Sequence, residues 1–321
     1  MVLVVQVRMP CRPAPTEGTL KGMSEITTAS YVPDGPTKRH VVVGVDGSST
    51  AIRAAHWAAV EADARQVPLL LVHVARRHAC APEGADMLEF TRQAIVERWA
   101  QTSRTAPPSI TALTLRGNPA TKLIELSTTA ELLVIGSVGR SSGARALLGS
   151  VATDLAAESR CPVAVIRPLQ SGASAVGPIL VVTEPALAGS PNAVAEAFQA
   201  AADRHSEVLV VDIARPTTWA SSGRAIQHHA ESWLDEQRRC HPAVPVRVVT
   251  YLGHPRTAIE KFSVTAQLVV VGRTLKQHWP HLTDAMRTAL CHTRCAVLIV
   301  PDGDPRTQQS PAPPTAIPAR A

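Results

Sequence analysis

The chain has 321 residues, a formal net charge of +6 and a hydrophobic content of 45%, with only 3% aromatic residues. This length predicts two domains, and the aliphatic composition favours parallel sheets buried on both faces. The basic residues are scattered, with isolated pairs such as Arg76-Arg77, which favours a solvated surface over a nucleic-acid-binding face. The scattered charge therefore gives no reason to expect nucleic acid as a partner. No apolar run approaches the roughly 18 residues of a membrane-spanning helix, so a membrane is not expected as a partner either.

The six cysteines show no metal-binding pattern, because none of them forms a C-x-x-C pair. Cys291 and Cys295 would need a second pair of ligands nearby, and none is evident. Cys161 and Cys295 both begin aliphatic strands, which is typical of buried free thiols. We therefore expect no metal site, and a reducing cytoplasmic location.

The ends of the chain and one short internal segment differ in composition from the rest. Residues 1–38 and 302–321 are rich in Pro and small polar residues without hydrophobic periodicity. This composition predicts disordered extensions. A Gly/Ser/Ala-rich linker over 170–177 separates two predicted domains, 39–169 and 178–301.

The two predicted domains are copies of one unit. Gly117-Asn-Pro-Ala-Thr matches Gly253-His-Pro-Arg-Thr, and Ala130-Glu-Leu-Leu-Val-Ile-Gly matches Ala266-Gln-Leu-Val-Val-Val-Gly, both at an offset of 136 residues. A third block, Arg-Cys-Pro/Ala-Val, recurs at an offset of 134. Three blocks in the same order indicate a tandem repeat of about 135 residues, a normal domain size.

Each copy alternates strands with helices. In the first copy the pattern predicts, in chain order, strand 40–45, helix 49–65, strand 69–74, helix 85–102, strand 110–115, a short helix opened by Pro119, strand 132–135, a helix from Ser150 and strand 163–166. In the second copy strands are expected near 179–183, 207–213, 244–251, 268–271 and 296–300. Such alternation implies right-handed crossovers, so we predict two α/β domains, each a doubly wound, five-stranded parallel open sheet with about four helices.

One glycine-rich loop is the candidate for chemistry. Gly136-Ser-Val-Gly139 follows a buried strand, and Gly149-Ser150 opens the next helix. Glycines at the carboxyl end of a parallel strand let backbone N–H groups approach an anion, and a helix amino end adds partial positive charge. Ligands of open α/β sheets bind outside these strand ends, so the loop is well placed to hold phosphates. Its spacing, Gly-x2-Gly-x9-Gly-Ser, is neither a P-loop nor the Gly-x-Gly-x-x-Gly dinucleotide motif.

This spacing resembles the ATP-binding signature of the universal stress protein family. The first strand with its continuation, Val42-Val-Gly-Val-Asp46-Gly-Ser48, is similar to that family, as are Gly117-x-Pro119 and Cys161-Pro162. The resemblance is close over about 40–168 and weaker over about 178–301, where it runs through the internal repeat.

The resemblance implies a Rossmann-like fold of the adenine nucleotide alpha hydrolase type and ATP, with Mg²⁺ as an option, as the ligand of the first domain. The loop would hold the phosphates, and the ends of the first two strands would meet the ribose and base. The residues it implies are Gly136, Ser137, Gly139, Gly149, Ser150 and Val151 around the phosphates, Asp46 and the backbone of Val45 at the ribose and base, and the backbone of Val74 at the adenine.

Simpler roles are open for some of these residues and their neighbours. Asp46 could simply cap the helix that begins near Ser49. His73 could be a core histidine whose hydrogen bonds are satisfied within the protein. Arg140 and Arg145 could neutralise phosphate or only solvate the loop.

The second copy departs from the motif. Leu275 stands at the second glycine position, and its Cβ would occupy space where the backbone should approach phosphate. No Gly-Ser follows, and the helix is expected to begin near Thr283-Asp284. The first strand ends in Val182-Thr-Glu184 in place of Asp-Gly-Ser. We expect that the second domain has lost nucleotide binding and serves packing or partner recognition.

No catalytic constellation is evident: the sequence has no Gly-x-Ser-x-Gly elbow and no paired carboxylates near the loop. The favoured interpretation is a cytoplasmic ATP-binding protein with a regulatory or stress-adaptation role, and not an enzyme. Two alternatives stay open. One is a slow nucleotide hydrolase in which Asp46 binds Mg²⁺ through phosphate, and the other is an interaction module with a vestigial site.

The last strand of each domain often pairs across a dimer interface in the family that this sequence resembles. Val163–Ile166 and Ala296–Val300 are therefore expected to pair within one chain, because exposed Val/Ile edges invite pairing. This would make a pseudo-dimer of the two repeats. A homodimer of whole chains and an unidentified protein partner are further options.

Overall fold

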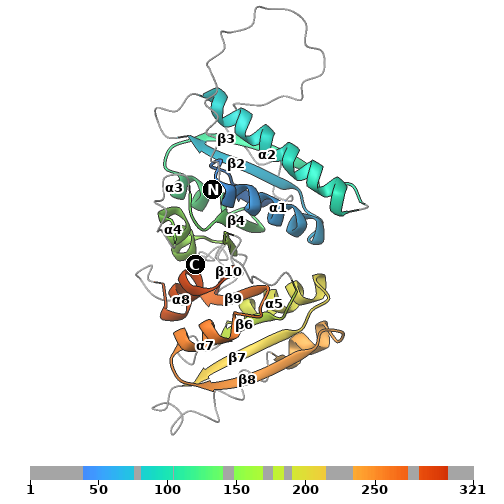
Figure 1. Cartoon of the computed structure of the whole chain (residues 1–321), viewed down its shortest axis with the longest axis vertical. Coiled ribbons are helices and arrows are strands. Elements are labelled where there is room, and N and C mark those ends of the chain that lie inside the picture. Colours follow the sequence, from blue (N-terminus) through green and yellow to red (C-terminus); the bar gives the residue numbers. More distant parts are fainter. Residues whose placement is uncertain are drawn as a thin grey trace, which may run out of the picture.

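The computed structural model describes residues 39–75, 81–103, 105–139, 148–168, 176–183, 190–214, 234–273 and 282–302. Within these residues the chain forms two similar halves stacked along its long axis (Figure 1). Most of the predicted extensions and of the predicted linker lie outside the described residues. No helix among the described residues is both long and apolar enough to span a bilayer.

The first half alternates strands and helices as the sequence predicts. Its elements are β1 (Val41–Gly44), α1 (Ser49–Ala64), β2 (Leu69–Ala75), α2 (Ala81–Thr102), β3 (Ile110–Arg116), α3 (Pro119–Leu126), β4 (Leu132–Gly136), α4 (Ser150–Glu158) and β5 (Val163–Ile166). Helix α2 begins at Ala81, earlier than the expected start at Ala85. Pro and an acidic residue suit a first helical turn, whereas Gly84 within that turn weakens the sequence pattern.

The second half repeats this order. Its elements are β6 (Ile179–Thr183), α5 (Pro191–Asp203), β7 (Val208–Ala214), β8 (Val246–Leu252), α7 (Pro255–Phe262), β9 (Leu268–Arg273), α8 (Asp284–His292) and β10 (Ala296–Pro301). Residues 234–240 are also helical.

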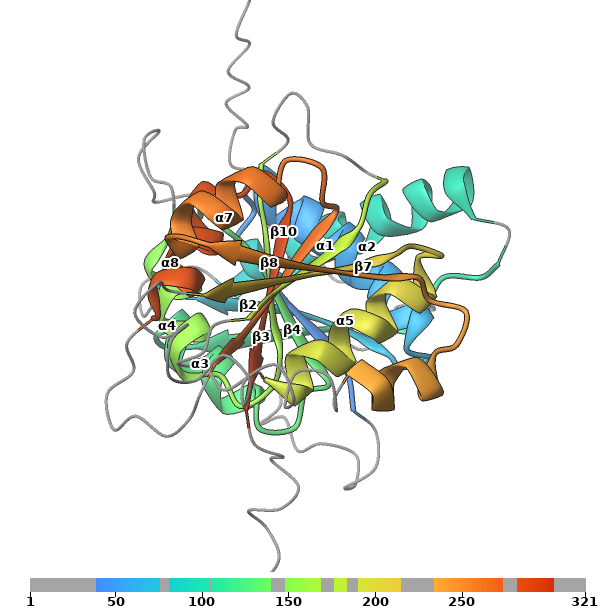
Figure 2. The same cartoon turned by 90° about the horizontal axis from the view of Figure 1, so that it is seen from below.

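All ten strands form one continuous sheet in the order β3-β2-β1-β4-β5-β10-β9-β6-β7-β8. Pairs within each half are parallel, and β5 meets β10 antiparallel, with Val165 opposite Val297. The predicted pairing of the two last strands is thus confirmed. Figure 2, seen along the long axis, shows the strands rotating from one end of the sheet to the other, as the usual strand twist requires.

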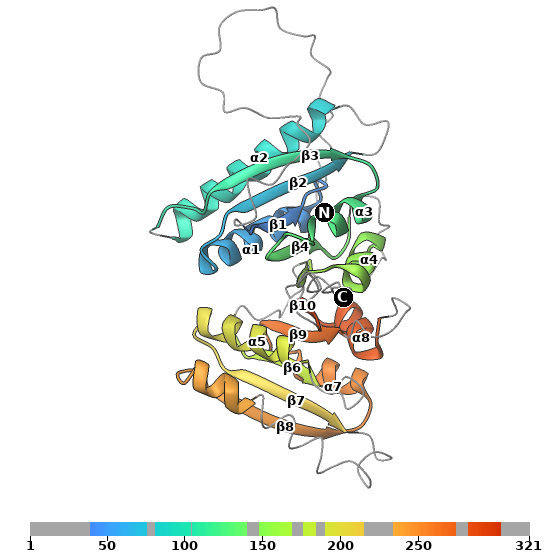
Figure 3. The same cartoon turned by 180° about the vertical axis from the view of Figure 1, so that it is seen from behind.

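Helices cover both faces of this sheet across both halves (Figures 1 and 3). Helices α1, α2 and α5 lie on one face, and α3, α4, α7 and α8 lie on the other. Each face carries one aliphatic core that continues through the β5–β10 junction. Buried alanines of α1, such as Ala54 and Ala58, let that helix approach the sheet closely, and the core is aliphatic as the composition predicts.

A buried group of charges joins α1 to α5 across the two halves. Glu61 of α1 is only 3% exposed. It pairs with Arg65 one turn later at 3.6 Å and with Arg204 from the second half. Arg65 in turn donates to Glu196 of α5 at 2.8 Å. Because each buried charge has an opposite partner, this network joins the halves without leaving an isolated ion.

Candidate functional site

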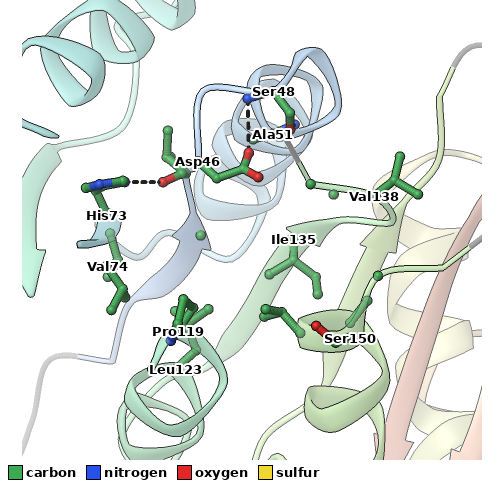
Figure 4. A pocket seen from close by; sticks show the side chains of 18 residues that line it. Asp46, Ser48, Ala51, His73, Val74, Pro119, Leu123, Ile135, Val138 and Ser150 are labelled. Atoms are coloured by element: carbon green, nitrogen blue, oxygen red, sulfur yellow. Dashed lines mark hydrogen bonds between the residues drawn. The ribbon is translucent and has the colours of Figure 1, made fainter. Parts of the chain in front are cut away.

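A cavity of about 350 Å³ lies at the carboxyl ends of β1, β2 and β4, between α3 and the amino end of α4. Figure 4 shows its labelled residues converging from these elements. This is where open α/β sheets bind ligands. Every residue that the sequence assigned to the site, except Ser137, lines it, namely Val45, Asp46, Val74, Gly136, Gly139, Gly149, Ser150 and Val151.

Asp46 follows β1 and is held by the chain just after it. Its Oδ1 accepts a hydrogen bond from the Ser48 N–H at 3.0 Å (Figure 4). The side chain that caps α1 is Ser48, whose Oγ accepts from the Ala51 N–H at 3.1 Å. The alternative that Asp46 is itself the helix cap is therefore wrong, and the bond to Ser48 fixes the orientation of its carboxylate.

The glycine loop packs against the start of α1 with no room for larger residues. A Cβ on Gly136 would stand 2.8 Å from Thr50 Oγ1, and a Cβ on Gly139 would stand 2.6 Å from Asp46 Oδ2. Thr50 Oγ1 also donates to the Val138 carbonyl at 2.5 Å. These contacts bring the loop backbone and the Asp46 carboxylate together along one wall of the cavity.

The amino end of α4 faces the cavity, and no side chain of the described residues caps it. Its N-cap residue is Gly149, which has no side chain that could accept a hydrogen bond from the helix. Ser150 and Val151 line the cavity. The Gly149 N–H donates to the Ser137 carbonyl at 2.7 Å, which ties this end to the loop. The first N–H groups of a helix have no partner within the helix, so an uncapped end favours an anion.

Ser137 is the predicted site residue that the cavity does not include. Its side chain is 1% exposed, and its Oγ has no hydrogen-bond partner among the described residues. The Ser137 N–H donates to the Ile166 carbonyl at 2.8 Å, which extends the β4–β5 ladder by one residue. Strand geometry, which the loop motif does not reveal, therefore sets the direction of this side chain.

The far end of the cavity is shaped by β1, β2 and α3. The Val45 N–H is bonded to the Val72 carbonyl at 2.8 Å, and His73 Nδ1 lies 2.8 Å from the Val45 carbonyl oxygen. Since a carbonyl only accepts, Nδ1 of His73 carries the proton. The histidine thus has a partner within the protein, as its alternative role requires, and it also lines the cavity (Figure 4).

Helix α3 contributes two cavity residues that the sequence did not assign, Pro119 and Leu123. Pro119 belongs to the matched block Gly117-x-Pro119, so the repeat was a signal for it. Leu123 carries no such signal, because one leucine on an amphipathic helix looks like any core residue. Both residues add apolar surface to the end of the cavity that faces β2.

The corresponding region of the second half is built differently. Thr283 takes the place of Gly149, and its side chain caps α8 by accepting from the Met286 N–H at 3.2 Å. Asp284 follows in place of Ser150, within the first turn. The helix begins where it was expected, but its amino end is occupied by a side-chain cap and a carboxylate, both of which disfavour an anion. Leu275 and Glu184 lie outside the described residues.

The structure describes both of the predicted buried thiols but neither of the loop arginines. Cys161 and Cys295 are free and buried, as predicted. Burial raises the pKa of the Cys161 thiol to about 12 and that of the Cys295 thiol to about 11. No group of three metal-ligating side chains occurs among the described residues. Arg140 and Arg145 lie outside them.

Comparison with known proteins gives matches in both halves. The sequence model of the universal stress protein family matches residues 38–167 and 176–301. Universal stress protein Rv2005c of Mycobacterium tuberculosis is 34% identical over 267 residues, which cover 74% of this chain and 88% of the relative. Rv2623 of the same organism, also a universal stress protein, is 28% identical over 269 residues, with 74% and 87% covered.

Among solved structures, a universal stress protein from Archaeoglobus fulgidus has the same fold. It aligns with a TM-score of 0.61 over 83% of this chain and 100% of its own, at 14% sequence identity. At this identity the similarity concerns the fold alone.

Proposed function

Because the chain belongs to the universal stress protein family in its tandem two-domain form, we propose that its first half binds ATP and that nucleotide occupancy regulates the protein in the cytoplasm. The observation that carries this proposal is the convergence of the Asp46 carboxylate, the close-packed Gly139 and the uncapped amino end of α4 on one cavity. Each of these features suits a different part of a nucleotide.

The phosphate end is the amino end of α4 together with the loop. The backbone N–H groups of Gly139, Ser150 and Val151 supply donors, and the helix adds partial positive charge. Gly136 and Gly149 keep side chains out of this space. Ser137 is not part of the proposal, because its side chain is buried away from the cavity lining.

The nucleoside end is formed by β1, β2 and α3. The Asp46 carboxylate is suited to accept hydrogen bonds from two ribose hydroxyls. The adenine would lie between Val74 and the apolar side chains of Leu123 and Pro119, with the Val45 carbonyl as an acceptor nearby. A cavity that is apolar at one end and rich in backbone donors at the other fits a nucleotide in one orientation.

Binding without rapid turnover fits the groups that line the cavity. Among the described lining residues the titratable side chains are Asp46 and His73. One oxygen of Asp46 is bonded to Ser48, and the proton on His73 Nδ1 is donated to Val45. Each of these side chains is already engaged in a hydrogen bond within the protein, so we expect neither to act as a general base and Mg²⁺ to be held mainly by the phosphates.

The second half is proposed not to bind nucleotide. The Thr283 cap satisfies one of the N–H groups that phosphate would use, and Asp284 would repel it. One ATP per chain is therefore expected.

The test is calorimetry of Mg·ATP binding to the full chain, to Gly139→Asp and to Leu275→Asp. Leu275→Asp is the matched control, because it adds the same charge at the equivalent loop position of the second half. We expect one site per chain, lost in Gly139→Asp and retained in Leu275→Asp. Two sites would refute the interpretation of the second half, and no binding at millimolar ATP would refute the proposed function. Steady-state phosphate release that collapses in Asp46→Ala would instead favour a hydrolase.

A further inference from the structure

Two nearly buried arginines cross the junction between the halves. Arg273, at the end of β9, is 6% exposed, and Arg167, just after β5, is 5% exposed. Arg273 Nη1 donates to the Ala156 carbonyl at 3.3 Å, and its Nη2 donates to the Ser159 carbonyl. These are carbonyls of the last turn and C-cap of α4, so the second half satisfies acceptors at the carboxyl end of that helix.

Arg167 makes the reciprocal contact. Its Nη1 donates to the Leu290 carbonyl, and its Nη2 donates to the Cys291 carbonyl at 3.2 Å. Both carbonyls belong to the last turn of α8 in the second half. A cation at a helix carboxyl end is favoured by the partial negative charge there, which offsets part of the cost of burying each guanidinium.

The two arginines occupy non-equivalent positions of the repeat. Arg273 follows Gly272 as Ser137 follows Gly136, whereas Arg167 corresponds to Pro301. The residue after the first loop glycine has therefore become, in the second half, a side chain that reaches into the first half. Burial lowers the pKa of Arg273 to about 10, with Arg160 adding repulsion, so the guanidinium stays charged at neutral pH.

Helix α4 connects this contact to the cavity. Its amino end lines the cavity, and its carboxyl end is held by Arg273. The helix has only 9 residues and is packed through Ala152, Leu155 and Ala156, all of which are buried. At a rise of about 1.5 Å per residue the two ends are about 13 Å apart, and we expect a helix this short to move as one rigid unit.

We propose that Arg273 is a positioning residue for the nucleotide site of the first half: by holding the carboxyl end of α4, it fixes the amino end that faces the phosphates. The role of the second half is then to complete the site of the first. This inference rests on the proposed function for its ligand, whereas the ordering of α4 does not depend on any ligand.

The test compares Arg273→Met with Arg167→Met in the full chain. Both variants remove a buried guanidinium at the same junction, but only the first releases α4. In hydrogen exchange without nucleotide, we expect Arg273→Met to speed exchange in 150–158 and Arg167→Met to speed it in 284–292. In calorimetry with Mg·ATP, we expect Arg273→Met to weaken binding by about fivefold or more, and Arg167→Met to leave it near the parent value.

Three outcomes would overturn the proposed positioning role of Arg273. Unchanged exchange in 150–158 in Arg273→Met overturns the proposal, and so does equal weakening of ATP binding in both variants, because the effect would then be a general loosening of the junction. If the parent chain binds no ATP, the proposed function fails and positioning of a nucleotide fails with it, while the exchange result still decides whether Arg273 orders α4. If Arg273→Met does not fold, Arg273→Lys replaces it in the test with the same expectations. Lysine keeps the charge but cannot donate to both carbonyls in the same way.

Discussion

The carboxylate of Asp46 lies directly against Gly139, since a Cβ added to Gly139 would stand 2.6 Å from Asp46 Oδ2. Asp46 follows β1 and Gly139 lies in the loop after β4, and the two meet because β1 and β4 are neighbours in the sheet. Any side chain at position 139 must therefore displace either the loop or the carboxylate. The proposed ribose and phosphate contacts are thus mechanically linked.

Gly139→Ala is expected to weaken ATP binding by about tenfold or more, since the methyl group moves at least one of the two binding elements. Calorimetry of the full chain measures the loss. The unfolding midpoint in urea without nucleotide serves as the control and should change little, because the site lies at the edge of the core. Parent-like affinity in this variant would show that the loop tolerates a Cβ and that the contact is unimportant for binding.

Ser137→Ala should leave ATP affinity unchanged and raise the free energy of unfolding by up to about 1 kcal/mol, because the removed hydroxyl is buried and has no hydrogen-bond partner among the described residues. The matched control is Ser159→Ala. Ser159 is equally buried, but its Oγ donates to the Cys161 carbonyl at 2.9 Å, so this change should cost about 1 kcal/mol. Both are measured by urea unfolding. A clear loss of ATP affinity in Ser137→Ala would place its hydroxyl on the phosphates after all.

Glu61→Ala is expected to lower the free energy of unfolding by about 3 kcal/mol, because it leaves the Arg204 guanidinium without its buried carboxylate, whereas Arg65 keeps Glu196. The control is Glu89→Ala. The Glu89 and Arg92 side chains are 52% and 43% exposed, and removing this surface pair should cost less than about 1 kcal/mol. Equal effects in urea unfolding would mean that the α1–α5 network adds no more than a surface ion pair.

Cys161 and Cys295 should resist alkylation by iodoacetamide in the native protein at pH 8, whereas the exposed Cys240 should react. The thiolate is the reactive form, and burial raises the pKa of Cys161 to about 12 and that of Cys295 to about 11. Mass spectrometry of digested protein locates the label, and the same reaction in urea is the control in which all three should be modified. Native labelling of Cys161 at the rate of Cys240 would contradict its burial.

Asp212→Asn should stabilise the protein at pH 7 more than at pH 4. Burial raises the pKa of Asp212 above its ordinary value, only partly offset by the hydrogen bond from Thr183. The folded state therefore holds this proton more tightly than the unfolded state, so the carboxyl costs stability as the pH rises through its folded pKa. Asn keeps an acceptor for Thr183 Oγ1, which lies 3.2 Å from Asp212 Oδ1. Urea unfolding at both pH values checks this, and an equal effect at both would mean that the pKa is not raised.

The loop motif predicted part of the cavity lining but not all of it. Gly136, Gly139 and Gly149 were recognisable from their spacing, which resembles the family signature. Ser137 belongs to the same stretch, yet its side chain is buried, because hydrogen bonding to Ile166 continues the strand ladder past Gly136. Leu123 reaches the cavity only through the packing of α3, for which its own sequence gives no sign.

The pairing of the last two strands was expected from the family resemblance. By itself, the sequence determined the order of strands and helices, the tandem repeat and the loop that ends at Gly149. These features are set by periodicity and by residues close together in the chain. The tertiary structure alone decided how one half completes the other. Arg273 and Ser159 are 114 residues apart, and nothing in the chain around Arg273 marks it as more than a basic residue after a strand. Its role arises because the antiparallel β5–β10 junction brings the end of β9 against the carboxyl end of α4, a contact that depends on the whole sheet.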